Sequence, residues 1–264
     1  MPRTRIRAVR RGATAAVTAA LLVPLAACGG TDAEAEDSAG GPPAADLTVL
    51  AASSLTDVFK TAGRAYERAH PGTKVTFSFA GSQELAAQVT QGAPADALVT
   101  ADTETMDGLG GDTGTATVIA TNRLVIATDE GNPEKIRGLE DLADPDVKVV
   151  LAAPEVPVGR YGQKILDARG IEVKPVSQEP NARAVLSKVE LGEADAGLVY
   201  RTDAATAPGK IDAVAIPTAQ NALARYPAAT LAASAHPEAA RAFVKWLSGP
   251  EARKILADGG FQQP

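Results

Sequence analysis

Residue types that support catalysis and metal binding are scarce in this chain of 264 residues. It contains a single cysteine, Cys28, and two histidines, His70 and His236. One cysteine cannot form a disulfide bond within the chain, and the two distant histidines are not a pair at ligand spacing for a catalytic metal ion. No Gly-x-Gly-x-x-Gly follows a predicted strand and no Gly-Lys-Ser/Thr loop occurs, so the usual nucleotide-binding signals are missing.

The N-terminus predicts export from the cytoplasm. A basic region without acidic residues precedes an apolar run at 13–27, which is too short and too rich in alanine to predict a membrane span. The run ends in Leu25-Ala26-Ala27-Cys28-Gly29, which resembles the lipobox of bacterial lipoproteins. That resemblance implies a signal peptide at 1–27 that is cut before Cys28, and a lipid on Cys28. An ordinary secretory signal is the alternative, and the export route, general secretory or twin-arginine, stays open.

A tether and an acidic domain follow the leader. Residues 28–45 consist mainly of Gly, Ala, Pro, Asp and Glu, which predicts a flexible tether between membrane and domain. Without the five arginines of the leader the formal net charge falls from −6 to −11, so nucleic acid is a poor partner. Such a charge gives an anion no long-range attraction, and any anion site must be local and built from dipoles.

Hydrophobic periodicity predicts strands that alternate with helices. The strand-like stretches are 47–51, 74–80, 97–101, 124–128, 147–153 and 196–200. Helical spacing follows Ser54, Ser82, Gly159 and Asn181, and recurs at 240–247 and 250–259. This order predicts an α/β fold of two lobes, each a mostly parallel sheet flanked by helices. We expect lobe one at 46–122 and 227–264, and lobe two at 123–226.

Four neutral turns of small residues stand directly before helix-patterned stretches. They are Ala51-Ala52-Ser53-Ser54, Ala80-Gly81-Ser82, Val156-Pro157-Val158-Gly159 and Pro180-Asn181-Ala182. A helix start presents unpaired N–H groups and a partial positive charge, so it binds an anion without Lys or Arg. If the four turns converge, they form a cavity of hydrogen-bond donors that suits a small, fully ionised oxyanion.

Simpler interpretations exist for these residues. Ser54 and Ser82 fit as N-caps of their own helices, and Tyr200 fits as a core residue with a satisfied hydroxyl. The positions of the two serines favour a role in ligand binding over a role as caps. Both follow predicted parallel strands, and open α/β folds bind ligands at the carboxyl edge of the sheet. A serine-dependent enzyme needs a base beside the serine, and we predict no catalytic residue. Arg160 and Arg183 lie close to the predicted site, where we expect solvated side chains.

Five strings in the chain occur in the order and at the separations typical of one family. They are Ala51-Ala52-Ser53-Ser54-Leu55, Phe79-Ala80-Gly81-Ser82, Gly92-Ala93-Pro94-Ala95-Asp96, Val156-Pro157-Val158-Gly159-Arg160-Tyr161 and Gly197-Leu198-Val199-Tyr200. Together they resemble the periplasmic molybdate-binding component of ABC transporters. The resemblance implies the type II periplasmic-binding-protein fold, with the ligand in the cleft between the lobes. It also implies that the oxyanion is bound by the hydroxyls of Ser54, Ser82 and Tyr200 and by the backbone N–H groups of Val158 and Ala182.

The resemblance implies a monomeric, lipid-anchored receptor on the extracytoplasmic face of the cell membrane, without a cofactor or a direct metal ligand. It would capture molybdate, and tungstate as well, through the oxygens and deliver it to a permease and its ATPase. A cavity of donors disfavours phosphate, which keeps a proton near neutral pH, although Glu84 and Glu155 are close enough to matter. A receptor for sulfate or thiosulfate is the alternative, and a serine-dependent enzyme is less favoured.

Overall fold

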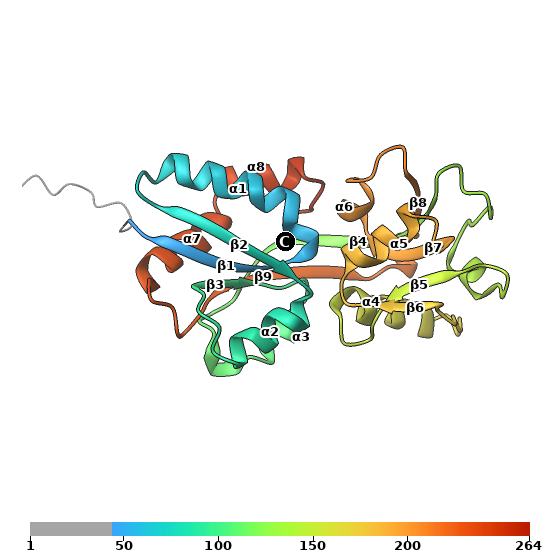
Figure 1. The fold of residues 1–264 in the computed structure, drawn as a ribbon, viewed down its shortest axis with the longest axis horizontal. Helices are drawn as coiled ribbons and strands as arrows, with labels where there is room; N and C mark the ends of the chain where they lie inside the picture. Colours follow the sequence, from blue (N-terminus) through green and yellow to red (C-terminus); the bar gives the residue numbers. More distant parts are fainter. Residues whose placement is uncertain (1–43) are drawn as a thin grey trace, which may run out of the picture. The chain divides into compact units, whose positions relative to one another are not determined.

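Strands and helices alternate through residues 44–264, the part of the chain that this computed structural model describes (Figure 1). The strands are β1 (Asp46–Ala52), β2 (Lys74–Ala80), β3 (Ala97–Val99), β4 (Thr117–Asp129), β5 (Val149–Ala152), β6 (Ser177–Glu179), β7 (Ala196–Tyr200), β8 (Ile211–Ala215) and β9 (Leu223–Thr230). The α-helices are α1 (Thr56–Ala69), α2 (Ser82–Thr90), α3 (Thr103–Asp107), α4 (Pro157–Asp167), α5 (Ala182–Glu190), α6 (Arg201–Ala204), α7 (Pro237–Leu247) and α8 (Pro250–Asp258). The predicted signal peptide, the lipidation site Cys28 and the tether as far as residue 43 lie outside the described residues.

One long strand divides the described unit into two halves. The sheet has the order β2-β1-β3-β9-β4-β7-β5-β6, with β8 also paired to β4. Residues 117–123 of β4 pair with β9, whereas residues 124–129 pair with β7 and β8. We call the part with β1–β3, α1–α3, α7 and α8 the first half, and the part with β5–β8 and α4–α6 the second half (Figure 1). The lobe limits predicted above stay a prediction.

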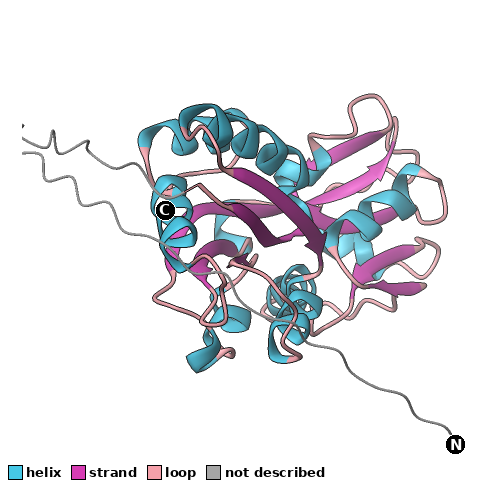
Figure 2. Cartoon of the chain, turned by 60° about the vertical axis from the view of Figure 1, so that its left-hand side comes forward, coloured by secondary structure: helices cyan, strands magenta, loops and turns pink. Residues whose placement is uncertain are grey.

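The predicted α/β fold class is confirmed. In each half the inner strands are parallel: β1 pairs with β2 and β3, and β5 pairs with β6 and β7. The antiparallel pairs of the described sheet all involve β4 or β9, the strands that connect the halves. Helices cover the strands on both faces (Figure 2). Parallel strands need such crossover helices, so the helix starts collect at the carboxyl edge of each half.

Hydrophobic periodicity predicted the longer helices correctly, because each of them buries an apolar stripe. Along α1 Phe59 and Tyr66 are fully buried in the core of the first half, and Val58, Ala62 and Ala65 are buried beside them. Burial of an aromatic side chain of this kind contributes about 1.5–3 kcal/mol to folding. The helix α4 begins at Pro157, three residues before the predicted start after Gly159, because proline is favoured in the first helical turn. The sequence patterns did not predict β6, β8, β9, α3 or α6.

Candidate functional site

The structure brings the four neutral turns together around one small cavity. All five residues predicted to hold the oxyanion line it: Ser54, Ser82, Val158, Ala182 and Tyr200. The other lining residues are Ala52, Ser53, Ala80, Gly81, Ala101, Val156, Pro157 and Asn181. The cavity measures about 10 Å³, close to the volume that one water molecule needs. A tetrahedral oxyanion is larger, so the walls must separate to admit it.

Strand ends explain why residues so far apart in sequence meet here. Ala52 and Ala80 are partners at the ends of the parallel strands β1 and β2, directly before the turns that carry Ser54 and Ser82. In the second half, α4 follows β5, α5 follows β6, and Tyr200 is the last residue of β7. Both halves therefore present the carboxyl ends of parallel strands to the same cavity, the usual position for a ligand in such folds.

Neither serine hydroxyl caps its helix, so the simpler interpretation of these residues is wrong. The N-cap positions belong to Ala52 before the short 3₁₀ turn Ser53–Leu55 and to Gly81 before α2. The Oγ atom of Ser54 lies 3.0 Å from the hydroxyl oxygen of Tyr226, and the Oγ atom of Ser82 accepts a hydrogen bond of 3.0 Å from the backbone N–H of Ala101. Because Ser82 accepts from a backbone donor, its own proton remains free for the cavity.

Tyr200 brings a buried hydroxyl that has no hydrogen-bond partner among the described residues. The residue is only 1% exposed, and burial raises the pKa of its phenol well above the ordinary value, so the group keeps its proton. An unpaired buried polar group costs about 1–3 kcal/mol. The simpler interpretation of Tyr200, a core residue with a satisfied hydroxyl, is therefore wrong. An oxyanion in the cavity would accept a hydrogen bond from this hydroxyl.

The second half contributes main-chain donors at two helix starts. Pro157 is the first residue of α4 and has no N–H, so Val158 carries the first backbone donor of that helix. Asn181 caps α5, its side-chain oxygen accepting from the N–H of Ala184 at 3.0 Å, and Ala182 is the first helical residue. The N–H groups of a first helical turn have no partner within the helix, and the helix dipole adds partial positive charge.

The two arginines near the site are engaged in ion pairs rather than solvated. The Nε atom of Arg160 donates to Asp102 at 3.0 Å, and Arg183 donates from Nε to Asp203 and from Nη2 to Asp57, each at 2.6 Å. Burial raises the pKa of Asp203 to about 6, although the guanidinium of Arg183 opposes the shift. Both arginines link an element of the second half to one of the first half, and neither lines the cavity.

No charged side chain is present among the residues that line the cavity. Neither Glu84 nor Glu155 reaches it, so the lining provides no carboxylate that could accept a proton from a guest. The histidines also lie elsewhere: Nδ1 of His70 is 2.9 Å from the carbonyl oxygen of Tyr66, and Nδ1 of His236 is 3.3 Å from Asp96. Within 44–264 no cluster of His, Cys, Asp and Glu is suited to a metal ion.

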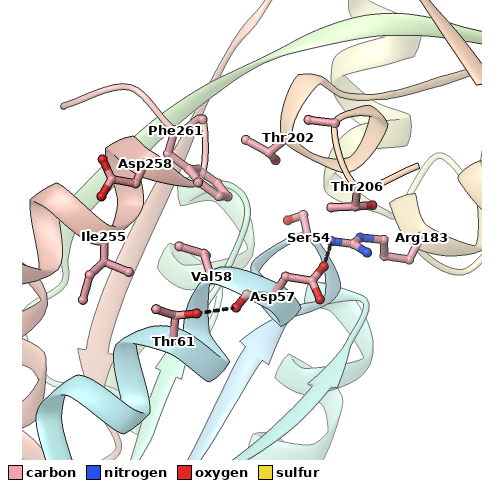
Figure 3. Close-up of a pocket in the computed structure, with 13 residues that line it drawn as sticks. Ser54, Asp57, Val58, Thr61, Arg183, Thr202, Thr206, Ile255, Asp258 and Phe261 are labelled. Carbon is pink, nitrogen blue, oxygen red and sulfur yellow. Dashed lines mark hydrogen bonds and ion pairs between the residues drawn. The ribbon is translucent and has the colours of Figure 1, made fainter. Parts of the chain in front are cut away.

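A second cavity of about 490 Å³ lies beside the first and is much larger. Figure 3 shows Asp57, Arg183 and Thr206 around it, with Ser54 as the one residue that it shares with the small cavity. Its wall contains the ion pair of Arg183 with Asp57 and the further carboxylate of Asp258, which would repel an anion. The small cavity is therefore the stronger candidate for an oxyanion site in spite of its volume, because it combines the helix starts with the unpaired hydroxyl of Tyr200.

Residues 47–262 match the family model of bacterial extracellular solute-binding proteins. The chain belongs to this family. The molybdate-binding protein ModA of Mycobacterium bovis is 41% identical, over 95% of this chain and 97% of that protein. The ModA protein of Haemophilus influenzae is 31% identical, over 82% of this chain and 90% of that protein. The resemblance stated from the sequence strings is thus confirmed.

Solved structures of solute-binding proteins share the fold of this family member. The periplasmic molybdate-binding protein of Azotobacter vinelandii superimposes with a TM-score of 0.72 at 21% identity, covering 83% of this chain and 99% of that one. The sulfate-binding protein SubI of Mycobacterium tuberculosis superimposes with a TM-score of 0.73 at 20% identity, covering 83% and 86%. At these identities the likeness shows the fold alone. No helix within 44–264 is long and apolar enough to cross a membrane.

Proposed function

We propose that this chain binds molybdate, and tungstate as well, and delivers it to an ABC importer. The observation that carries the proposal is the cavity of neutral donors from both halves, in which the buried Tyr200 hydroxyl has no described partner. Relatives as similar as 41% identical are named molybdate-binding proteins, which supports the choice of ligand. The chemistry fits an oxyanion without protons, because hydroxyl and N–H donors surround the cavity and no charged group lines it.

Binding in this proposal closes the two halves around the ligand. Ser54 and Ser82 donate from the first half, and Tyr200, Val158 and Ala182 donate from the second. All these donors are engaged only when the halves meet, so the dianion stabilises the closed form. Contacts already join the halves beside the cavity: Nε2 of Gln83 donates to the carbonyl oxygen of Pro180 at 2.8 Å, and Arg183 pairs with Asp57.

Delivery completes the proposed function. A permease on the membrane would recognise the closed form, and its ATPase would drive import. We further propose that the chain acts as a monomer, held on the extracytoplasmic face by a lipid on Cys28. The role is binding without catalysis: neither histidine is among the residues that line the cavity, so the serines have no histidine base there.

Sulfate is the main competitor for this site. It is also an unprotonated tetrahedral dianion, and the fold of the sulfate-binding protein SubI superimposes as well as that of the molybdate-binding protein. The deciding experiment is calorimetric titration of the purified chain from residue 44 onward, its endogenous anion removed, with molybdate, tungstate, sulfate and thiosulfate. We expect molybdate and tungstate to bind at least about a hundredfold more tightly than sulfate, a difference of about 2.7 kcal/mol. Sulfate binding as tight as molybdate binding would contradict the proposed ligand.

A further inference from the structure

Two ion pairs join the halves without lining the small cavity. Arg183 of α5 donates from Nη2 to Asp57 of α1 at 2.6 Å, and Arg160 of α4 donates from Nε to Asp102 at 3.0 Å. In each pair the arginine belongs to the second half and the aspartate to the first. We call Arg183–Asp57 and Arg160–Asp102 the inter-half ion pairs. None of these four residues lines the small cavity, so their charges lie outside the immediate surroundings of a ligand there.

Each arginine is oriented by a contact within its own half. Nε of Arg183 donates to Asp203 of α6 at 2.6 Å, and the side chain of Asp203 is fully buried. Nη1 of Arg160 donates to the carbonyl oxygen of Glu155 at 2.6 Å. These contacts do not depend on closure, because both partners belong to the second half. Opening of the halves would therefore separate the aspartates of the first half from guanidinium groups that keep their orientation.

Asp102 is oriented in a similar way from the first half. Its Oδ1 atom caps α3 by accepting from the N–H of Thr105 at 3.1 Å, which leaves Oδ2 for Arg160. Arg160 also donates from Nη2 to Oγ1 of Thr105 at 2.6 Å. The side chain of Asp102 is 4% exposed, whereas that of Asp57 is 56% exposed. The loss of one partner matters more in a buried pair than in an exposed one, so the pair at Asp102 should contribute more.

The inter-half ion pairs lie over opposite faces of the sheet. Asp57 is in α1 and Asp102 is the N-cap of α3, and these two helices lie on opposite sides of the strands of the first half (Figure 1). The lining residues Ser54 and Ala101 stand close to Asp57 and Asp102 in the chain, so the small cavity lies between the two pairs. Figure 3 shows the Arg183–Asp57 pair in the wall of the larger cavity. The halves are thus joined on both sides of the small cavity.

We propose that Arg160 and Arg183 are positioning residues that hold the halves closed on both faces of the sheet, and so set how long any oxyanion stays bound without contributing to the choice of oxyanion. This inference rests on the proposed function. A larger share of closed, binding-competent chain raises the apparent affinity for every ligand by the same factor. In the proposed site the serines and Tyr200 contact the ligand and can discriminate between anions, whereas the inter-half ion pairs cannot.

The test compares Asp57→Asn and Asp102→Asn with the parent chain in calorimetric titrations with molybdate and with sulfate. Asp57→Asn removes an exposed charge and leaves Arg183 on Asp203, so we expect binding to weaken by about two- to fivefold. In Asp102→Asn the amide oxygen is needed by the N–H of Thr105, so the amide nitrogen faces Arg160 and cannot accept. We expect a loss of about tenfold or more there.

The proposal makes two further demands on these variants. In each variant the affinities for molybdate and sulfate should fall by the same factor, so that their ratio stays that of the parent chain. Radiolabelled molybdate, diluted into an excess of unlabelled molybdate, should dissociate faster by about the factor by which affinity falls, since loss of a contact that holds a complex closed acts mainly on dissociation.

Asp258→Asn is the matched control. Asp258 lines the larger cavity as Asp57 does, but its ion pair with Lys254, at 2.8 Å, stays within α8. It should leave affinity and dissociation unchanged. Arg183→Lys completes a double-mutant cycle, because a single ammonium keeps a charge beside the buried Asp203 but lacks the fork that contacts Asp203 and Asp57 together. Asp57→Asn should therefore cause no further loss in an Arg183→Lys background.

Unchanged affinity and dissociation in both aspartate variants would overturn the inference. A changed ratio of molybdate to sulfate affinity would overturn it as well, because the ion pairs would then act on the ligand itself. If Asp102→Asn does not fold, Asp57→Asn decides alone, since its side chain is exposed. A parent chain that binds sulfate and not molybdate would instead contradict the proposed ligand, and the same variants titrated with sulfate would still decide whether the ion pairs hold the halves closed.

Discussion

The two sides of the cavity reach the same donor chemistry by different means. The first half supplies hydroxyls of Ser54 and Ser82, each held by a hydrogen bond from another part of the fold. The second half supplies backbone N–H groups at the starts of α4 and α5, together with the unpaired hydroxyl of Tyr200. Side-chain donors depend on residue identity, whereas main-chain donors depend only on where a helix begins.

This difference predicts which substitutions the site tolerates. In the proposed site Val158 and Ala182 act through the main chain, so a change of side chain there should alter the shape of the pocket and leave the donors intact. A change at either serine removes a donor outright. The donors of the second half depend instead on the position of the backbone. A Cβ atom at Gly159 would overlap the carbonyl oxygen of Ala153. The close approach of α4 to the end of β5 therefore requires glycine at this position.

The largest loss of molybdate affinity is expected for a substitution at Gly81, where the first half contacts the second. A Cβ atom at Gly81 would overlap the carbonyl oxygen of Pro180 in the second half. Gly81 itself has φ −62° and ψ 142°, values that alanine adopts freely, so Gly81→Ala strains closure rather than the first half. We expect molybdate affinity to fall by about a hundredfold or more in calorimetry, with an unfolding temperature without ligand that is unchanged or slightly higher.

Gly111→Ala provides the control for this variant, because a Cβ atom there meets nothing within 4 Å. It should leave both affinity and stability unchanged. Full molybdate affinity in Gly81→Ala would mean that binding does not need the contact between Gly81 and Pro180, and the two sides of the cavity would then act independently.

Removal of a serine hydroxyl should have the next largest effect. A hydrogen bond to a charged group contributes about 1.5–3 kcal/mol, so Ser54→Ala and Ser82→Ala should each weaken molybdate binding by about one to two orders of magnitude. Ser248→Ala is the matched control, since its buried hydroxyl has no described partner and lies outside the cavity. Unchanged affinity in both serine variants, measured by calorimetry, would show that the serine hydroxyls of the first half do not bind the ligand.

The sequence predicted the elements that bring local signals and missed those that depend on long-range pairing. The turns before α1, α2, α4 and α5 are marked by small residues ahead of an apolar stripe, so the pattern of the chain predicted these four turns. The choice of Ser54, Ser82, Val158, Ala182 and Tyr200 within and beside them came from the family resemblance. Tyr226, which hydrogen-bonds Ser54, was missed because its position follows from the pairing of β9 with β3 and β4. The sequence of β9, which contains Pro227, gives no indication of the strands with which it pairs.

The smallest of these effects is expected for Tyr200→Phe. The hydroxyl has no described partner in the closed arrangement, so its removal loses one donor to the ligand but also removes the cost of burying an unpaired group, about 1–3 kcal/mol. We expect molybdate affinity to fall by less than about tenfold in calorimetry, and the unfolding temperature without ligand to stay the same or rise. A clear loss of stability without ligand would show that the hydroxyl is satisfied within the protein, and the second half would then donate through its main chain alone.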